Sequence, residues 1–232
     1  MAPLRAAVLA DPHLGSHTND IARFEKIVAE VNDWQPDIVL LLGDFINTQI
    51  FGRGHIPPDV IAHVLGPLKA RLGTYAILGN HDWIYDGRAV WRALEAVGIT
   101  VLENDSLEIK DQTGDFWLVG LADDQTRRPE ARKTLEPIPD AALKLVMAHD
   151  PATFADIPTG PNLTLCGHTH GGQVRLPFVG PLVNSSRAPL RWTSGHVVED
   201  GRHLFVSRGL GTSGIPLRFN CPPEVCFLSI GG

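Results

Sequence analysis

Runs of consecutive apolar residues alternate with helix-like segments through the first half of the chain. The apolar runs predict buried strands over residues 4–10, 38–42, 74–78 and 99–102. Apolar side chains recur at the 3.6-residue helical period after Asp20, a residue type that caps helices. They are Ile21, Phe24, Ile27, Val28 and Val31. Two further helices are predicted over residues 57–71 and 87–97. Continuous apolar strands separated by helices are typical of parallel βαβ units, so the fold class is α/β.

The second half of the chain is richer in strands than in helices. Strands are predicted over residues 106–109, 116–121, 143–148, 162–166, 196–199, 203–207 and 224–230. A polar linker bounded by prolines, residues 123–140, has room for one short helix. The pattern contains no internal repeat, low-complexity segment or domain boundary, so we predict one domain over residues 1–232.

Five of the predicted strands end in polar residues of the kinds that bind metals. In chain order these are Asp11 with His13, Asp44, Asn80 with His81 and Asp82, His149, and His168 with His170. Ligands of open α/β sheets bind beyond the carboxyl ends of the strands. We therefore expect these side chains to meet in one cleft.

The pair His168 and His170 is the most concentrated of these signals. Side chains two residues apart in an extended segment point the same way, so both imidazoles can converge on one ligand. Neutral imidazole is the commonest metal ligand among side chains at neutral pH. Gly167 and Gly171 beside the pair permit close approach of the backbone.

Composition and charge narrow the range of partners. The chain has 232 residues, of which 44% are hydrophobic and 20% charged, and its net charge is −6. Lys and Arg are scattered, which argues against a nucleic-acid partner bound through its phosphates. A membrane span is not predicted, because the sequence has no run of about 18 uncharged apolar residues. The stretch before Asp11 is too short for a signal peptide, so we expect a cytoplasmic protein.

The polar strand ends supply the donors for more than one metal ion. The seven candidate ligands provide four imidazoles, two carboxylates and one amide. They are Asp11, His13, Asp44, Asn80, His149, His168 and His170. Seven exceed the needs of one tetrahedral ion but suit two ions that share a carboxylate. Two divalent ions roughly 3.5–4 Å apart can activate water and hold both oxygens of a phosphoryl displacement.

Taken in order, these motifs resemble the full motif set of the calcineurin-like metallophosphoesterases. The matching residues are Asp11-x-His13, Gly43-Asp44, Gly79-Asn80-His81-Asp82, His149 and Gly167-His168-x-His170. Residues 167–177 and 207–213 are similar, more loosely, to the bacterial branch of YkuE- and YaeI-like phosphodiesterases. A UDP-2,3-diacylglucosamine pyrophosphatase is similar to that branch. The resemblance implies a sandwich of two mixed β-sheets flanked by helices.

The resemblance also implies a role for each matching residue. One metal ion would be held by Asp11, His13, Asp44 and His170. The other would be held by Asp44, Asn80, His149 and His168, with Asp44 bridging. A metal-bridging hydroxide would attack the phosphorus, His81 would face the substrate, and Asp82 would orient His81. Manganese is the first expectation for the two divalent ions, with iron, zinc or cobalt also compatible with such donors.

Several of these residues have simpler interpretations. Asp11 and Asp44 could cap the helices that follow them. Asn80 could adopt a left-handed turn, and His149 could be structural. Asn47 stands three residues after Asp44, where purple acid phosphatases have tyrosine, so a ferric–tyrosinate centre is not expected.

Two segments that follow metal motifs are apolar where loops are usually polar. They are residues 45–58, with Ile50 and Phe51, and residues 176–183, with Phe178 and Val179. Either they pack against the domain, or they form a groove for an acyl or other apolar group at a membrane surface.

We therefore predict a metal-dependent phosphoester hydrolase whose substrate is a small phosphodiester or pyrophosphate, lipid- or nucleotide-linked. The partners expected are this substrate and, at most, a peripheral membrane contact; the sequence leaves the oligomeric state open. Two alternatives remain. The same centre could serve a phosphomonoesterase or phosphoprotein phosphatase, or the fold could serve a non-catalytic interaction protein. All seven ligands and His81 are present, which favours an enzyme.

Overall fold

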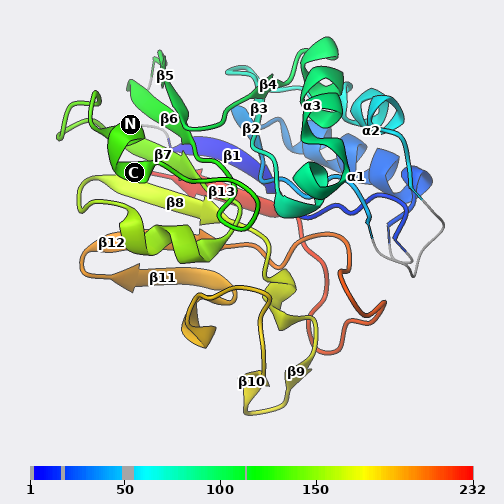
Figure 1. Ribbon diagram of the computed structural model, residues 1–232. Coiled ribbons are helices and arrows are strands. Elements are labelled where there is room, and N and C mark those ends of the chain that lie inside the picture. The colour runs from blue at the N-terminus through cyan, green and yellow to red at the C-terminus, as the bar shows by residue number, and fades with distance from the viewer. Residues whose placement is uncertain (1–2, 17–18, 49–54, 113, 232) are drawn as a thin grey trace.

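A computed structural model describes residues 3–16, 19–48, 55–112 and 114–231 of the protein. Two mixed β-sheets pack face to face and helices flank them, which confirms the predicted α/β sandwich (Figure 1). Among the described residues, no helix combines the length and the apolar character needed to cross a membrane.

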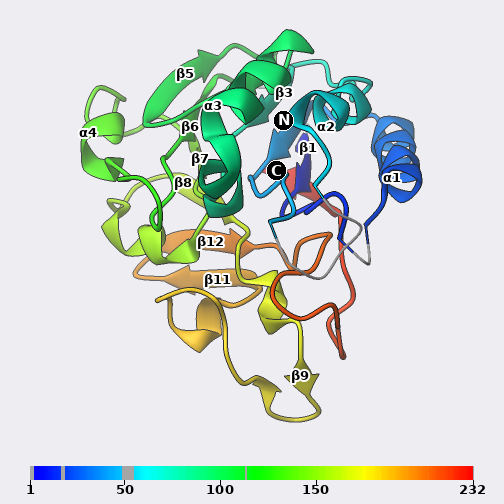
Figure 2. The same ribbon diagram turned by 45° about the vertical axis from the view of Figure 1, so that its right-hand side comes forward.

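The first sheet carries the N-terminal βαβ units. Its strand order is β13 (Cys226–Ile230), β1 (Leu4–Leu9), β2 (Ile38–Leu41), β3 (Thr74–Ala76) and β4 (Thr100–Val101). The strands β1 to β4 run parallel, and β13 pairs antiparallel with β1. Three helices lie against its outer face, as Figure 2 shows: α1 (Ile21–Trp34), α2 (Pro58–Leu65) and α3 (Asn80–Ala96).

The second sheet has parallel strands in its centre and antiparallel strands at its edges. Its order is β11 (Gly195–Glu199), β12 (Arg202–Val206), β8 (Asn162–Cys166), β7 (Lys144–Met147), β6 (Phe116–Gly120) and β5 (Asp105–Ile109). The outer face packs against α4 (Ala131–Leu135) and the 3₁₀ turns η1 (Pro151–Asp156) and η3 (Leu190–Trp192).

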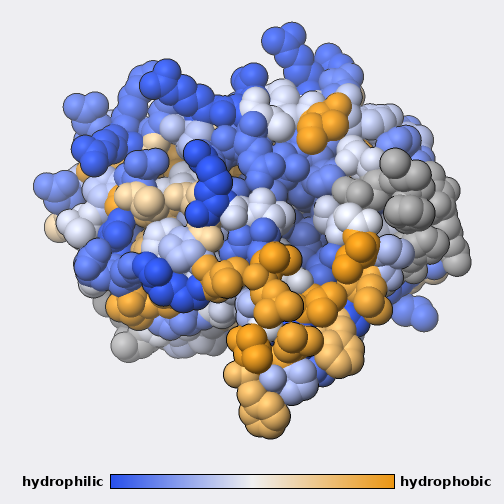
Figure 3. Space-filling view, turned by 60° about the horizontal axis from the view of Figure 1, so that its bottom comes forward, coloured by the Kyte–Doolittle hydropathy of each residue, from blue (hydrophilic) through white to orange (hydrophobic). Residues whose placement is uncertain are grey.

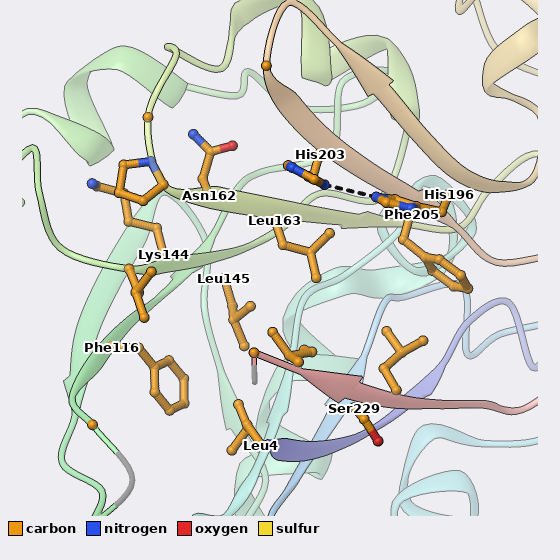
Figure 4. Close-up of a pocket in the computed structure, with 18 of the residues that line it drawn as sticks. Leu4, Phe116, Lys144, Leu145, Asn162, Leu163, His196, His203, Phe205 and Ser229 are labelled. Carbon is orange, nitrogen blue, oxygen red and sulfur yellow. Dashed lines mark hydrogen bonds between the residues drawn. The ribbon is translucent and has the colours of Figure 1, made fainter. Parts of the chain in front are cut away.

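Apolar side chains from both sheets form the core between them. Val8 and Leu40 of the first sheet and Leu118, Met147 and Leu165 of the second are buried there. Because this core holds the strands in fixed register, the loops at their carboxyl ends are also held in place. At the opposite end, beside Leu4 and Leu145, the sandwich opens into a cavity of about 840 Å³ (Figure 4).

Helices α2 and α3 and one hairpin differ from the sequence prediction. Helix α2 ends at Leu65 instead of residue 71, because Gly66 and Pro67 follow it. Helix α3 begins at Asn80, and a kink at Asp86, with φ −168° and ψ 84°, separates its start from the helix predicted over residues 87–97. Its first residues are polar and buried at the strand ends, so the apolar period reveals only its later turns. A hairpin of β9 (Arg175–Leu176) and β10 (Gly180–Pro181) was not predicted, since both strands have only two residues.

Candidate metal centre

The seven predicted ligands follow the carboxyl ends of β1, β2, β3, β7 and β8. Five of them adopt the left-handed backbone conformation that side chains disfavour. Their φ angles are 49° at Asp11, 38° at His13, 57° at Asp44, 68° at His168 and 51° at His170. Such strain is retained where the surrounding structure requires it, and it concentrates at functional sites.

A first group of donors consists of Asp11, His13, Asp44 and His170. One donor atom from each lies within 4.8 Å of the others, and all four residues are buried. The Nε2 atom of His13 is 3.2 Å from Nε2 of His170 and 3.4 Å from Oδ2 of Asp44.

A second group consists of Asp44, His149 and His168, which meet the same distance criterion. Nε2 of His149 is 3.2 Å from Oδ2 of Asp44 and 3.2 Å from Nδ1 of His168. Asp44 therefore belongs to both groups. These are the two sets that the family resemblance implies, apart from Asn80.

Asn80 lies on the first turn of α3 and is buried. Its side-chain oxygen Oδ1 has no hydrogen-bond partner among the described residues. An orphaned buried acceptor needs a reason, and a cation at the second group of donors would supply one. Oxygen, carboxylate and imidazole donors together fit divalent ions of the manganese, iron, cobalt and zinc type.

Backbone carbonyls orient the histidines by contacting the ring nitrogen that faces away from the cluster. Nδ1 of His13 is 3.0 Å from the Ile46 carbonyl oxygen, and Nδ1 of His149 is 2.7 Å from that of Leu42. In both residues this contact fixes the tautomer that leaves Nε2 free as a metal donor. His168 is reversed, with Nε2 3.2 Å from the Ser185 carbonyl oxygen and Nδ1 inside the cluster.

The glycines of the motifs leave room for the ligands. A Cβ atom at Gly79 would lie 2.3 Å from Oδ1 of Asp44 and 2.6 Å from Cε1 of His149. A Cβ atom at Gly167 or Gly209 would lie 2.6 Å or 2.8 Å from Oδ2 of Asp11. Only a residue without a side chain fits at these positions.

Burial and mutual charge shift the pKa values of the cluster. Burial raises the pKa of Asp11 to about 7 and lowers that of His13 to about 4. Burial also acts to raise the pKa of Asp44, but His149, His81 and His13 together outweigh it and hold that pKa well below its usual range. The charge of Asp44 in turn raises the pKa of His149 well above its usual value, against the effect of burial.

His81 lies beside the first group of donors, with its ring centroid 4.7 Å from that of His13. Its Nδ1 atom contacts the Thr48 hydroxyl, and its Nε2 atom is 3.4 Å from Oγ of Ser213. The expectation that Asp82 orients this imidazole is wrong. The Asp82 carboxylate accepts backbone N–H bonds from Gly79, Asp44 and Ile46 instead. It points back over the start of α3, so it fixes the loop of Asp44 rather than the ring of His81.

The simpler interpretations of the ligands fail where the structure tests them. Asp20 caps helix α1 through its side chain, and Pro57 occupies the N-cap position of α2, so neither Asp11 nor Asp44 caps the helix that follows it. Asn80 is a helical residue without a positive φ angle.

Sequence reasoning missed several residues that contact the ligands. The Asp150 carboxylate is 3.5 Å from Nε2 of His168, and Nε2 of Gln125 is 2.8 Å from the same nitrogen. Nη2 of Arg218 is 3.4 Å from Nδ1 of His170. Asp150 directly follows the ligand His149, and this position next to a ligand could have indicated its contact. The other two lie in loops whose sequences give no sign of the contact.

The structure bears differently on the two apolar segments predicted from the sequence, residues 45–58 and 176–183. Ile50 and Phe51 of residues 45–58 lie outside the described residues. In residues 176–183 the apolar side chains are exposed, so this segment does not pack against the domain. Figure 3 shows apolar side chains gathered on the protruding part of the molecule.

This fold and this cluster define a class of metal-dependent hydrolase, and comparison with known proteins gives the family. The family model "Calcineurin-like phosphoesterase" matches residues 4–172. The chain therefore belongs to the calcineurin-like phosphoesterase family.

Two curated relatives match nearly the whole chain. "Uncharacterized metallophosphoesterase YkuE" of Bacillus subtilis is 30% identical over 95% of this chain and 77% of its own. "Phosphodiesterase YaeI" of Escherichia coli is 34% identical over 99% of this chain and 83% of its own. Both support the bacterial branch that the sequence indicated.

Among solved structures, the Haemophilus influenzae NAD nucleotidase NadN is similar in fold, with a TM-score of 0.56 and 12% identity. The match covers 89% of this chain and 45% of that one. At this identity the likeness shows the fold alone.

Proposed function

We propose that the protein hydrolyses a phosphodiester or pyrophosphate bond at a dinuclear metal centre. The observation that carries the proposal is Asp44, whose carboxylate belongs to two groups of buried donors at once. The ligands proposed are Asp11, His13, Asp44 and His170 for one ion, and Asp44, Asn80, His149 and His168 for the other. Manganese is the first candidate for both ions, and iron, zinc or cobalt are the alternatives.

When bound, two divalent ions would supply an activated water between them and positive charge to the phosphoryl oxygens. The chain's own residues would position the substrate. His81 stands beside the ligands and retains 9% of its surface accessible, so it can reach a phosphoryl or leaving oxygen. Thr48 and Ser213 contact its two ring nitrogens and hold the ring in this orientation.

The preference for a diester or pyrophosphate has two supports. One is the printed name of the relative YaeI, a phosphodiesterase. The other is the exposed apolar segment next to the centre, which favours a lipid-linked substrate over a small polar monoester. The cytoplasmic location and the lack of a nucleic-acid partner stay predictions.

The test compares hydrolysis of bis-p-nitrophenyl phosphate with that of p-nitrophenyl phosphate by metal-loaded wild type and Asp44→Asn. We expect hydrolysis that favours the diester and falls at least about 100-fold in the variant, because the shared carboxylate is lost. A preference for the monoester would leave the centre in place and overturn the substrate class. No hydrolysis by a protein with two bound ions would instead favour the non-catalytic interaction protein.

A further inference from the structure

The hairpin β9–β10 presents apolar side chains to solvent. Val179 is 66% exposed, and Phe178 at the turn is fully exposed. Phe178 also has a φ of 65°, in the left-handed region that disfavours a bulky residue. A side chain that protrudes entirely into solvent gives little packing in return. The strain and the exposure together point to a contact outside the folded chain.

A second segment extends the same surface. Residues 214–219 lie beside the hairpin, since Phe219 donates its N–H to the Gln173 carbonyl and accepts from the Arg175 N–H. Its apolar side chains are also about half exposed. We name the combined surface the apolar ridge, and it consists of Leu176, Phe178, Val179, Leu182, Val183, Ile215, Leu217 and Phe219.

The apolar ridge is convex. Figures 1 and 2 show the hairpin projecting away from both sheets, and Figure 3 shows the apolar side chains on this projection. A small apolar ligand needs a concave pocket that surrounds it. A projecting apolar tip is suited instead to insertion into the boundary between lipid headgroups and acyl chains.

The charge around the ridge differs from that of the whole protein. Residues 171–223 contain six arginines and two acidic residues, Glu199 and Asp200, although the net charge of the chain is −6. Arg187 and Arg191 stay mostly exposed while they pair with Asp124 and Glu199. A tip that carries no carboxylate of its own, on a segment with more arginines than acidic residues, complements an anionic lipid surface.

The ridge continues directly into the candidate metal centre. Strand β9 begins five residues after His170, and a Cβ atom at Gly172 would lie 2.6 Å from Cβ of Pro181 in β10. The second segment begins next to Ser213, which contacts His81. A surface bound by the ridge would therefore lie close to the entrance of the centre.

We propose that the apolar ridge docks the protein on an anionic lipid bilayer by inserting the tip of the β9–β10 hairpin. Docking would bring a lipid-linked phosphoester to the metal centre, and this last step rests on the proposed function. The docking itself does not depend on catalysis.

The test is sedimentation with vesicles of phosphatidylglycerol and phosphatidylethanolamine, beside vesicles of phosphatidylcholine alone. The variant Phe178→Asp/Val179→Asp changes two exposed side chains, so its fold should be unaffected. Leu143→Asp is the control, since Leu143 is 60% exposed and precedes β7 at the opposite end of the sandwich. We expect wild type and control to bind anionic vesicles and the double variant to bind at least about tenfold more weakly.

A label gives a second readout that does not depend on charge. The three native cysteines are buried, so an environment-sensitive dye can be attached at Val179→Cys or Leu143→Cys. Anionic vesicles should shift the emission of the dye to the blue at position 179 only.

Three results would overturn the proposal: no binding of wild type to anionic vesicles, equal binding of the double variant, or equal binding to phosphatidylcholine. Hydrolysis of bis-p-nitrophenyl phosphate by the same variants separates the two claims. Vesicle binding without any hydrolysis would overturn the proposed function and leave the docking intact.

Discussion

At the scale of single residues, buried charge is the main feature of the metal centre. Asp11 and Asp44 are buried completely or nearly so, and their pKa values move in opposite directions. Burial dominates at Asp11, while at Asp44 the neighbouring histidines, His149 foremost, together outweigh burial. The metal-free site thus holds protons that a bound cation must displace, because ligands bind metal as carboxylate and neutral imidazole.

This displacement predicts how metal binding depends on pH. The pKa of Asp11 is raised to about 7, so below that pH its carboxyl is protonated in the metal-free fold. His149, with a pKa well above its usual value, also carries a proton. Manganese binding should therefore release more protons at about pH 6 than at about pH 8, and its affinity should increase with pH.

Calorimetric titration in two buffers of different ionisation enthalpy measures this release. The variant Asp11→Asn keeps the shape of the side chain but carries no titrating proton. Proton release by this variant should differ less between the two pH values than release by wild type; part of the difference should remain, because burial and the charge of Asp44 raise the pKa of Asp82 to about 7 as well. Equal release by wild type at both pH values would show that Asp11 is already ionised in the metal-free protein.

At the scale of elements, the turn from β3 into α3 organises the site. Gly79 is the N-cap residue of α3, Asn80 and His81 occupy the first helical turn, and the Asp82 carboxylate accepts from the amide of Gly79. The amide of His81 donates to Oδ1 of Asp44, so the helix start also fixes the shared ligand. The side chain of Asp82 lies in the first turn of α3, where the helix dipole favours negative charge.

The variant Gly79→Ala tests the packing of this turn. The new Cβ atom would collide with Oδ1 of Asp44 at 2.3 Å and with the Asp44 backbone nitrogen at 2.7 Å. Backbone cannot move aside cheaply, so we expect metal affinity to fall by at least about tenfold.

Gly66→Ala is the matched control. Gly66 follows α2 and has a helical φ angle, and a Cβ atom there meets its nearest neighbour at 3.3 Å. This variant should bind metal as wild type does, as measured by the same titration. Normal metal binding by Gly79→Ala would mean that the Asp44 loop adjusts freely.

These elements also show how far the sequence could predict the structure. The strands and the ligands at their ends follow from apolar runs that stop at Asp, Asn or His, and parallel strands bring such ends to one edge of the sheet. The hydrogen-bond partners of the Asp82 side chain could not be predicted from the sequence. Helical geometry directs a side chain in the first turn toward backbone amides. Arg218 and Gln125 could not be predicted either, since their contacts span 48 and 43 residues of chain.

At the scale of the whole molecule, the sandwich has two different ends. The carboxyl ends of the parallel strands carry the metal ligands, while the amino ends of β7 and β8 open into the cavity beside Leu145. The apolar ridge lies on the side of the ligands. The molecule can thus bind a surface through one end and leave the rest of the fold unaffected.

The central claim is that one carboxylate joins two metal sites, and metal content tests it most directly. Metal-free wild type and Asp44→Asn would be loaded with manganese, freed of excess ions and measured for ions per chain. We predict two ions per wild-type chain and fewer than about one in the variant, since both groups of donors lose the shared ligand. Two tightly held ions in Asp44→Asn, or one or none in wild type, would contradict the dinuclear centre.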